Sequence, residues 1–199
     1  MPVTKSGEGT YYAADGSGAC GFAPASGGPL LVAAMNAPDW AGSGVCGMCA
    51  RVTGPLGEVT VRIVDLCPEC QTGDLDLSPE AFDRIAEHAA GRVPITWIEV
   101  PCDVGGPLVY HFKDGSNQWW TAIQIREHRH RIASLAVEQN GAWTDIERLD
   151  YNYFVIENLG PGPYSLRVTD VHGQEVTDQG VPLGDDQDAP SASQLPVCD

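Results

Sequence analysis

Residues 61–86 read VRIVDLCPECQTGDLDLSPEAFDRIA, and the order of elements in the amino-terminal half can be worked out from them. The run up to Asp65 is almost wholly apolar, which is typical of a buried strand. In residues 74–77 aspartates alternate with leucines, so an extended backbone would bury both leucines and expose Asp76. Asp65 ends the apolar run, so its carboxylate must emerge at the rim or be hydrogen-bonded. The segment therefore predicts two strands, and each carries one carboxylate that must reach solvent or be hydrogen-bonded.

A helix is expected directly after the second strand, in the run LSPEAFDRIAEHAAG. Ser78 can cap its first turn, and Pro79 suits the first helical position. Gly91 is expected to end the helix. The apolar face of this helix would comprise Phe82, Ile85, Ala86 and Ala89.

Short strand-like runs separated by turn residues fill the rest of the chain, which contains 23 glycines and 15 prolines in 199 residues. This pattern predicts an all-β, β-rich protein. The run CDVGGPL resembles a linker, so we expect two domains, residues 1–102 and 103–199. Strand-like runs with NG, PGP and HG turns between them predict a small antiparallel sandwich for the second domain. The acidic stretch at residues 184–194 is expected to be a mobile loop.

The charge limits the possible partners. With 27 acidic against 11 basic residues the formal charge is -16, which opposes binding to nucleic acid, anionic membrane surfaces and acidic polysaccharides. Neutral targets with apolar faces remain, although the charge can also serve only to keep a secreted protein soluble. No run of 18 apolar residues is present, so no membrane span is expected. The opening MPVTKSGEG lacks signal-peptide character, so the protein is either cytosolic or has lost its signal.

The seven cysteines allow two interpretations. Those in CGMC (residues 46–49) and CPEC (residues 67–70) have the C-x2-C-x17-C-x2-C spacing of a four-cysteine zinc site. Cys20, Cys102 and Cys198 have no place in such a site, and they favour a disulfide framework instead. Because the count is odd, at least one thiol is free or paired between chains.

Two carboxylates across one groove are what glycoside hydrolysis requires, one as acid and one as base or nucleophile. Asp65 and Asp76 are candidates for such a pair. In the structural alternative, Asp76 accepts backbone amides at a turn and Asp65 caps a loop. Thr10 and Tyr12 carry hydroxyls of the kind that line sugar grooves. The histidines of REHRH (residues 126–130) are expected to lie on a solvated strand and turn, and no motif for acyl transfer or nucleotide binding is present.

The adjacent tryptophans of QWWTAIQIRE pose a problem of alternation. Ile123 and Ile125 mark the core face of a strand, so strict alternation would bury Trp119 and expose Trp120. Both can be exposed only if the regular strand begins after them or a bulge intervenes. With Tyr151 nearby, two exposed indoles would form a flat aromatic strip on which the apolar faces of sugar rings can stack.

Several long motifs in one order, among them GEGTYY, VRIVDLCPE, GDLDLSPEAFDRIA, FKDGSNQWWTAIQIREH and LDYNYFV, resemble bacterial expansin-like proteins. The resemblance implies a six-stranded double-psi β-barrel followed by an immunoglobulin-like β-sandwich that binds cellulose. It places the essential acid at Asp76, with Asp65 and Thr10 in the same groove and Tyr12 among the substrate contacts. It implies that both tryptophans lie outside. The implied binding face consists of Trp119, Trp120, Tyr151 and Lys113.

The cysteines are more similar to those of plant expansins. That pattern implies the pairs Cys20–Cys46 and Cys49–Cys102, which leaves Cys67 to pair with Cys70 and Cys198 free. Cys67 stands where many bacterial members carry a groove tyrosine, so one stacking ring is missing. The strong negative charge also departs from the many basic members, and it favours cellulose or xyloglucan over acidic wall polymers.

The resemblance implies a secreted, monomeric protein without cofactor or metal that loosens cell walls without cutting polysaccharide. Related family-45 endoglucanases have an aspartate after the aromatic pair of the opening strand, where this chain has Ala13. Without that base, hydrolysis should be negligible. Asp15 lies close by, so a weak endoglucanase with Asp76 as acid remains an alternative. The others are a pure carbohydrate-binding module and a cytosolic zinc protein.

Overall fold

The computed structural model describes residues 3–197. The chain divides between Cys102 and Asp103 into two compact units, each with its own hydrophobic core.

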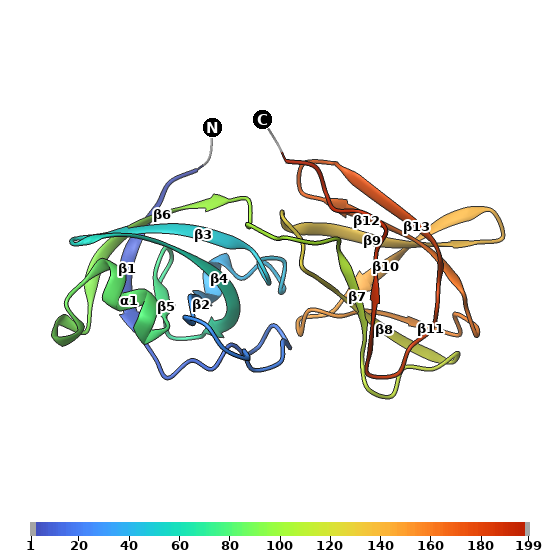
Figure 1. Ribbon diagram of the computed structural model, residues 1–199, viewed down its shortest axis with the longest axis horizontal. Coiled ribbons are helices and arrows are strands. Elements are labelled where there is room, and N and C mark those ends of the chain that lie inside the picture. Colours follow the sequence, from blue (N-terminus) through green and yellow to red (C-terminus); the bar gives the residue numbers. More distant parts are fainter. Residues whose placement is uncertain (1–2, 198–199) are drawn as a thin grey trace. The chain divides into compact units, whose positions relative to one another are not determined.

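The first unit is a closed barrel of six strands in the order β1-β5-β2-β4-β3-β6 (Figure 1). Strands β1 and β5 pair in parallel, as do β2 and β4, and the other neighbours are antiparallel. The prediction of a six-stranded double-psi β-barrel is confirmed. The strands are β1 (Lys5–Tyr11), β2 (Val32–Asn36), β3 (Cys49–Gly54), β4 (Gly57–Cys67), β5 (Leu75–Leu77) and β6 (Val93–Val100).

The alternating side chains of β5 lie in the barrel as the sequence predicted, with the leucines in the core. Leu75 and Leu77 of β5 are fully buried in the core, whereas Asp76 between them is only half-buried. Trp97 of β6 also lies in the core and donates its indole N–H to the carbonyl of Gly73 at 2.8 Å. This bond fixes the turn that precedes β5.

The helix is shorter than expected. Helix α1 (Pro79–Ile85) starts as predicted, with the Ser78 hydroxyl accepting a hydrogen bond from the Ala81 N–H at 3.4 Å. It stops at Ile85, whose carbonyl accepts the N–H of Leu56 from the β3–β4 turn at 2.9 Å. The chain then becomes extended and forms a short 3-10 helix, η2 (His88–Ala90). Ala89 is therefore exposed, and its assignment to the apolar face was wrong. A further 3-10 turn, η1 (Ala37–Asp39), follows β2.

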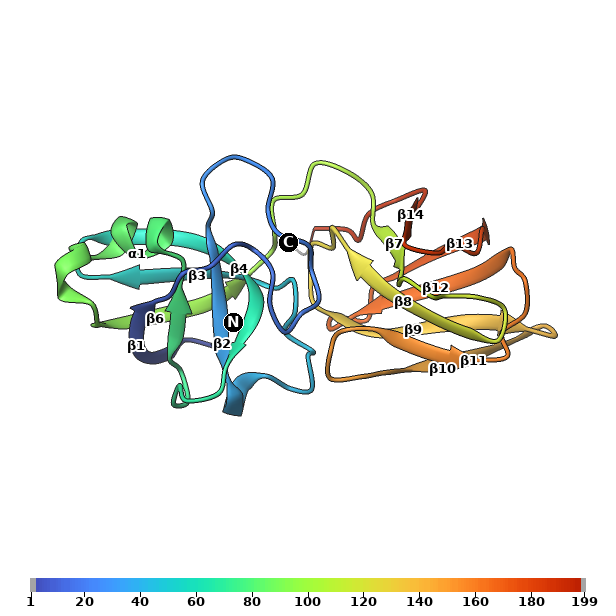
Figure 2. The ribbon, with the colours of Figure 1, turned by 90° about the horizontal axis from the view of Figure 1, so that it is seen from below.

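The second unit forms a β-sandwich from eight strands in the order β13-β12-β9-β10-β11-β8-β7-β14 (Figures 1 and 2). All its neighbouring strands are antiparallel. The sandwich predicted for the second domain is thereby confirmed. Its strands are β7 (Val109–Phe112), β8 (Trp120–Arg126), β9 (Ile132–Gln139), β10 (Ala142–Arg148), β11 (Phe154–Glu157), β12 (Tyr164–Asp170), β13 (Glu175–Val181) and β14 (Gln187–Pro190).

The acidic stretch near the carboxyl end was predicted to be a mobile loop, but part of it is a strand. Residues 187–190 form β14, which pairs with β7 (Figure 2) and buries Ala189. Just beyond it, Ser191 donates to the buried carboxylate of Asp178 at 2.6 Å, and Tyr110 donates to the same oxygen at 2.8 Å. Edge pairing and this buried network order a segment whose composition alone is typical of disorder.

The histidines of REHRH are also placed differently from the prediction. His128 and His130 are buried rather than solvated. The His128 ring lies 2.8 Å from the carbonyl of His130, and the His130 ring lies 3.1 Å from that of Pro196. Backbone carbonyls therefore satisfy these rings, which sequence periodicity could not indicate.

Six cysteines form three disulfides, which are the pairs that the resemblance implied. The four-cysteine zinc site was a wrong alternative, because its cysteines are divided among these bridges. Cys198 lies outside the described residues. The pairs are Cys20–Cys46, Cys49–Cys102 and Cys67–Cys70.

Candidate functional site

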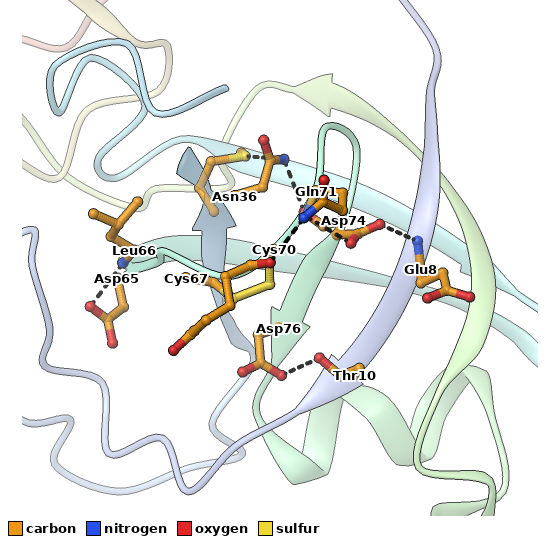
Figure 3. Close-up of a disulfide and its surroundings, with 12 residues drawn as sticks. Glu8, Thr10, Asn36, Asp65, Leu66, Cys67, Cys70, Gln71, Asp74 and Asp76 are labelled. Carbon is orange, nitrogen blue, oxygen red and sulfur yellow. Dashed lines mark hydrogen bonds between the residues drawn. A yellow bond between two sulfur atoms is a disulfide. The ribbon is translucent and has the colours of Figure 1, made fainter. Parts of the chain in front are cut away.

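Four residues on adjacent barrel strands form one row, which we call the carboxylate row. Asp76 of β5 pairs in register with Thr10 of β1 on one side and with Ala34 of β2 on the other. Ala34 also pairs with Asp65 of β4. The two aspartates thus lie two strands apart, so their Cα atoms are separated by roughly 10 Å. Ala34, with its small side chain, is the residue between them in the register. Figure 3 shows Thr10, Asp65 and Asp76.

Asp76 is held by a side chain. Its carboxylate accepts a hydrogen bond from the Thr10 hydroxyl at 2.6 Å. Burial raises the pKa of Asp76 above its ordinary value, against the opposing effect of the Thr10 bond. Turn amides are instead bound by Asp74, which accepts the N–H groups of Glu8 at 2.7 Å and Gln71 at 3.0 Å. Accepting backbone amides at the turn, the structural role considered for Asp76, is therefore the role of Asp74.

Asp65 is engaged with the backbone. One carboxylate oxygen accepts the N–H of Ala19 at 2.7 Å and that of Leu66 at 2.8 Å. Gly18 approaches so closely that a Cβ atom there would lie 2.3 Å from Cγ of Asp65. Asp65 therefore fixes the loop at residues 18–19, as the structural alternative for it predicted.

Tyr12 brings an unsatisfied hydroxyl to the same region. Its hydroxyl oxygen is buried and lacks a hydrogen-bond partner among residues 3–197. Burial raises the pKa of Tyr12, and the carboxylates of Asp65, Asp76 and Asp15 raise it further. The phenol is thus a neutral donor next to acidic side chains. Tyr11 instead packs on Phe82, with ring centroids 4.9 Å apart.

Asp15 was considered as a substitute base. Its carboxylate accepts hydrogen bonds from the Ser17 hydroxyl at 2.6 Å and the Ser17 N–H at 2.8 Å. These bonds lower the pKa of Asp15. A stabilised carboxylate is a weaker base, so this geometry disfavours Asp15 as an activator of water.

In the sandwich, Trp119 is 66% exposed and Trp120 is half-buried. The regular strand β8 begins at Trp120, so strict alternation does not apply to Trp119, and its ring lies outside the core as the resemblance implied. Asn117 sets this geometry, because its side-chain oxygen accepts the Trp119 N–H at 2.9 Å. A hollow of about 530 Å³ lies beside Trp119 and is lined also by Asn117, Pro161 and Leu183.

Tyr151 is 39% exposed and packs against Tyr153, with ring centroids 5.7 Å apart. The ammonium group of Lys113 lies over the Tyr153 ring, 5.9 Å from its centroid. Tyr153 is itself buried beside His111, which contacts Asp188 of β14 at 2.8 Å. Tyr153 thus contacts both Tyr151 and Lys113, two residues of the predicted binding face. The sequence analysis missed Tyr153, although it lies only two residues after Tyr151 in LDYNYF.

No helix among residues 3–197 is long and apolar enough to cross a membrane. Over the same described part of the chain, no group of three or more His, Cys, Asp or Glu side chains could hold a metal ion.

Comparison with known proteins places this chain in a family. A double-psi β-barrel family model described as lytic transglycolase (DPBB_1) matches residues 4–97. Expansin-YoaJ of Bacillus subtilis is 39% identical over 153 residues, which are 75% of this chain and 66% of that protein. Expansin-like protein 1 of Dictyostelium discoideum is 32% identical over 178 residues, 83% of this chain and 62% of that protein. The chain thus spans about two thirds of the length of these curated relatives.

A crystal structure of the expansin of Clavibacter michiganensis matches with a TM-score of 0.90 and 31% identity, covering 96% of this chain and 98% of that one. The chain belongs to the expansin family. A second structure, of a mutant Clavibacter expansin in complex with cellohexaose, matches equally well. The resemblance seen in the sequence motifs is therefore confirmed over both units of this expansin.

Proposed function

We propose that this expansin acts outside the cell, binds cellulose and related neutral glucans, and loosens cell walls without hydrolysing them. The exposed rings of Trp119 and Tyr151 carry the proposal, since large exposed rings suit stacking against sugar faces. With the half-buried ring of Trp120 they would form the aromatic strip. The cellohexaose complex of the Clavibacter expansin supports a glucan as the ligand. The face would include Lys113, and xyloglucan is a further candidate ligand.

Three disulfides support an extracellular location, because such bridges form and persist in oxidising compartments. The formal charge of -16 supports neutral rather than acidic wall polymers as partners. We propose that the protein acts as a monomer without cofactor or metal.

The carboxylate row supports an absence of hydrolysis. Asp76, whose pKa is raised by burial, suits a proton donor. A hydrolase also needs a base, yet Asp15 is stabilised by Ser17 and Asp65 already accepts two backbone amides. Thr10, Asp76 and Tyr12 would then bind glucan hydroxyls rather than activate water.

One observation favours a second candidate, weak hydrolysis with Asp76 as acid. Asp65 stands in the same row, two strands away, so a second carboxylate is present even though it is engaged. A pure binding module is a third candidate, in which the barrel serves only as a spacer.

The test measures three quantities on the same preparations: binding to microcrystalline cellulose, extension of a cellulose–xyloglucan film under constant load, and release of reducing ends. We expect wild type to bind and extend the film without releasing sugar. Asp76→Asn should bind normally but lose film extension, whereas the exposed control Glu58→Gln should retain both. Sustained sugar release that Asp76→Asn abolishes would establish hydrolysis. Full film extension by Asp76→Asn would instead establish a pure binding module.

A further inference from the structure

The sheet face that carries Trp120 continues across β8, β7 and β14 as a set of polar side chains. Because alternate residues of a strand share a face, Gln124 and Arg126 lie on the same face of β8 as Trp120. In the register of the paired strands, His111 of β7 stands opposite Gln124, and Asp188 of β14 stands opposite His111 (Figure 2). We call Gln124, Arg126, His111 and Asp188 the polar row.

The polar row is joined by side-chain contacts. Nδ1 of His111 lies 2.8 Å from Oδ1 of Asp188, and a guanidinium nitrogen of Arg126 lies 3.6 Å from the same oxygen. Nε of Arg126 also donates to the side-chain oxygen of Gln124 at 2.6 Å. Burial lowers the pKa of His111 against the opposing effect of Asp188, so a neutral ring donates its Nδ1–H to the carboxylate. His111 thus orients a carboxylate that stands beside a guanidinium.

The polar row adjoins the aromatic strip through Tyr153. The rings of His111 and Tyr153 meet edge-on, with centroids 6.1 Å apart. Tyr153 in turn packs against Tyr151, and the ammonium group of Lys113 lies over its ring. A chain of contacts therefore runs from Asp188 to Tyr151, which is an exposed ring of the strip.

The row is covered at one end and open at the other. Gln124 and His111 are buried, whereas the Asp188 side chain is 57% exposed and that of Arg126 is 20% exposed. Asp188 contacts both His111 and Arg126 through Oδ1, and a carboxylate has a second oxygen with further lone pairs. Asp188 can therefore accept hydrogen bonds from a ligand while it keeps both contacts.

Two structural roles are the alternatives for Asp188. A charge on an edge strand such as β14 can prevent pairing with another chain. Such a charge needs no buried partner, yet Asp188 is held by side chains from both β7 and β8. Asp188 could also act only by orienting His111, and the experiment below separates this role from binding.

We propose that Asp188 and Arg126 form a polar sugar-binding position that continues the aromatic strip beyond Tyr151. A carboxylate accepts a hydrogen bond from one hydroxyl while a guanidinium donates to the next, and neighbouring hydroxyls of a neutral glucan can fill both roles. Stacking on aromatic rings supplies contact area, whereas a few placed polar groups fix the orientation of a ligand. The choice of glucan as the ligand rests on the proposed function.

The position is tested by titrating cellohexaose into the full chain while following the backbone amide signals of the sandwich. Losing a hydrogen bond to a charged group should weaken binding on the order of tenfold in Asp188→Ala. The control Asp145→Ala, at an exposed carboxylate on β10, should bind like wild type. Binding that Trp119→Ala weakens but Asp188→Ala does not would overturn the polar position and leave the proposed function standing.

A double-mutant cycle separates direct binding from a positioning role. If Asp188 contacts the sugar, Asp188→Ala should weaken binding by the same factor in wild type and in a His111→Ala background. A loss that disappears in the His111→Ala background would show that Asp188 acts only by orienting His111, and it would overturn the proposal.

The Nε–H signal of Arg126 tests the same position in the unaltered chain, so the proposal stays testable even where His111→Ala fails to fold. We expect saturating cellohexaose to shift this signal, because the guanidinium exchanges water for sugar hydroxyls. An unshifted signal in a protein that binds cellohexaose overturns the proposal. If wild type binds no cellohexaose, the proposed function fails, and the assignment of a glucan to this position fails with it.

Discussion

Removing the single ring of Trp119 gives the most quantitative test of the aromatic strip. A tryptophan side chain can bury up to about 250 Å², so an exposure of 66% leaves roughly 160 Å² of Trp119 in contact with water. A sugar ring stacked on one face covers about half of that area. Burying ~80 Å² at ~25 cal/mol per Å² contributes about 2 kcal/mol. Trp119→Ala should therefore weaken binding to cellulose about 30-fold.

The assay is a depletion isotherm on microcrystalline cellulose at moderate salt, fitted for affinity and capacity. Trp143→Ala is the matched control, because Trp143 is an indole on β10 that is covered by the guanidinium of Arg167, 4.7 Å from the ring centroid. We expect Trp143→Ala to bind like wild type. A change of less than about threefold in Trp119→Ala, or an equal loss in Trp143→Ala, would refute the assignment of the strip.

Three further predictions concern the barrel. The pKa of Asp76 is raised, so its ionised form destabilises the fold at neutral pH. Asp76→Asn should raise the free energy of unfolding measured in urea at pH 7 by ~1.4 kcal/mol for each unit by which the measured pKa exceeds 3.8, and this gain should disappear below pH 3.8. Gly18→Ala would place a methyl group against Asp65, and urea unfolding should show a loss of about 1–3 kcal/mol, whereas unchanged stability would show that the loop adapts. Cys49→Ala/Cys102→Ala opens a bridge between residues 53 apart and should cost about 4 kcal/mol of unfolding free energy, and a loss below about 1 kcal/mol would contradict the loop-entropy argument.

Local alternation predicted the barrel well where one face of a strand is buried. The pattern around Asp76 indicated correctly which side chains fill the core, because the strand period is independent of the partner strands. Alternation failed at Trp119, since the strand boundary depends on the hydrogen bond that Asn117 makes to the turn. The local sequence also did not predict that α1 ends at Ile85, because the Ile85 carbonyl accepts the N–H of Leu56 from another part of the chain.

Sequence spacing could not predict which residues pair when they are far apart in the chain. The four cysteines of CGMC and CPEC have the spacing of a zinc site, and only the positions of Cys20 and Cys102 in space divide them among disulfides. Strand β14 was missed for the same reason, because its order comes from β7 and not from its own acidic composition.

The acidic side chains of this expansin fall into two groups that differ in how completely the protein satisfies them. Asp74 and Asp178 each accept more than one hydrogen bond from the protein, which is typical of structural carboxylates. Asp76 is half-buried with its pKa raised, and the nearby Tyr12 hydroxyl has no hydrogen-bond partner within residues 3–197. Such features are unfavourable in the free protein, as is the exposed ring of Trp119. Hydroxyl groups of the proposed glucan would satisfy Asp76 and Tyr12 in the barrel, and stacking would cover Trp119 in the sandwich, so glucan binding by each unit would account for features that packing alone leaves unexplained.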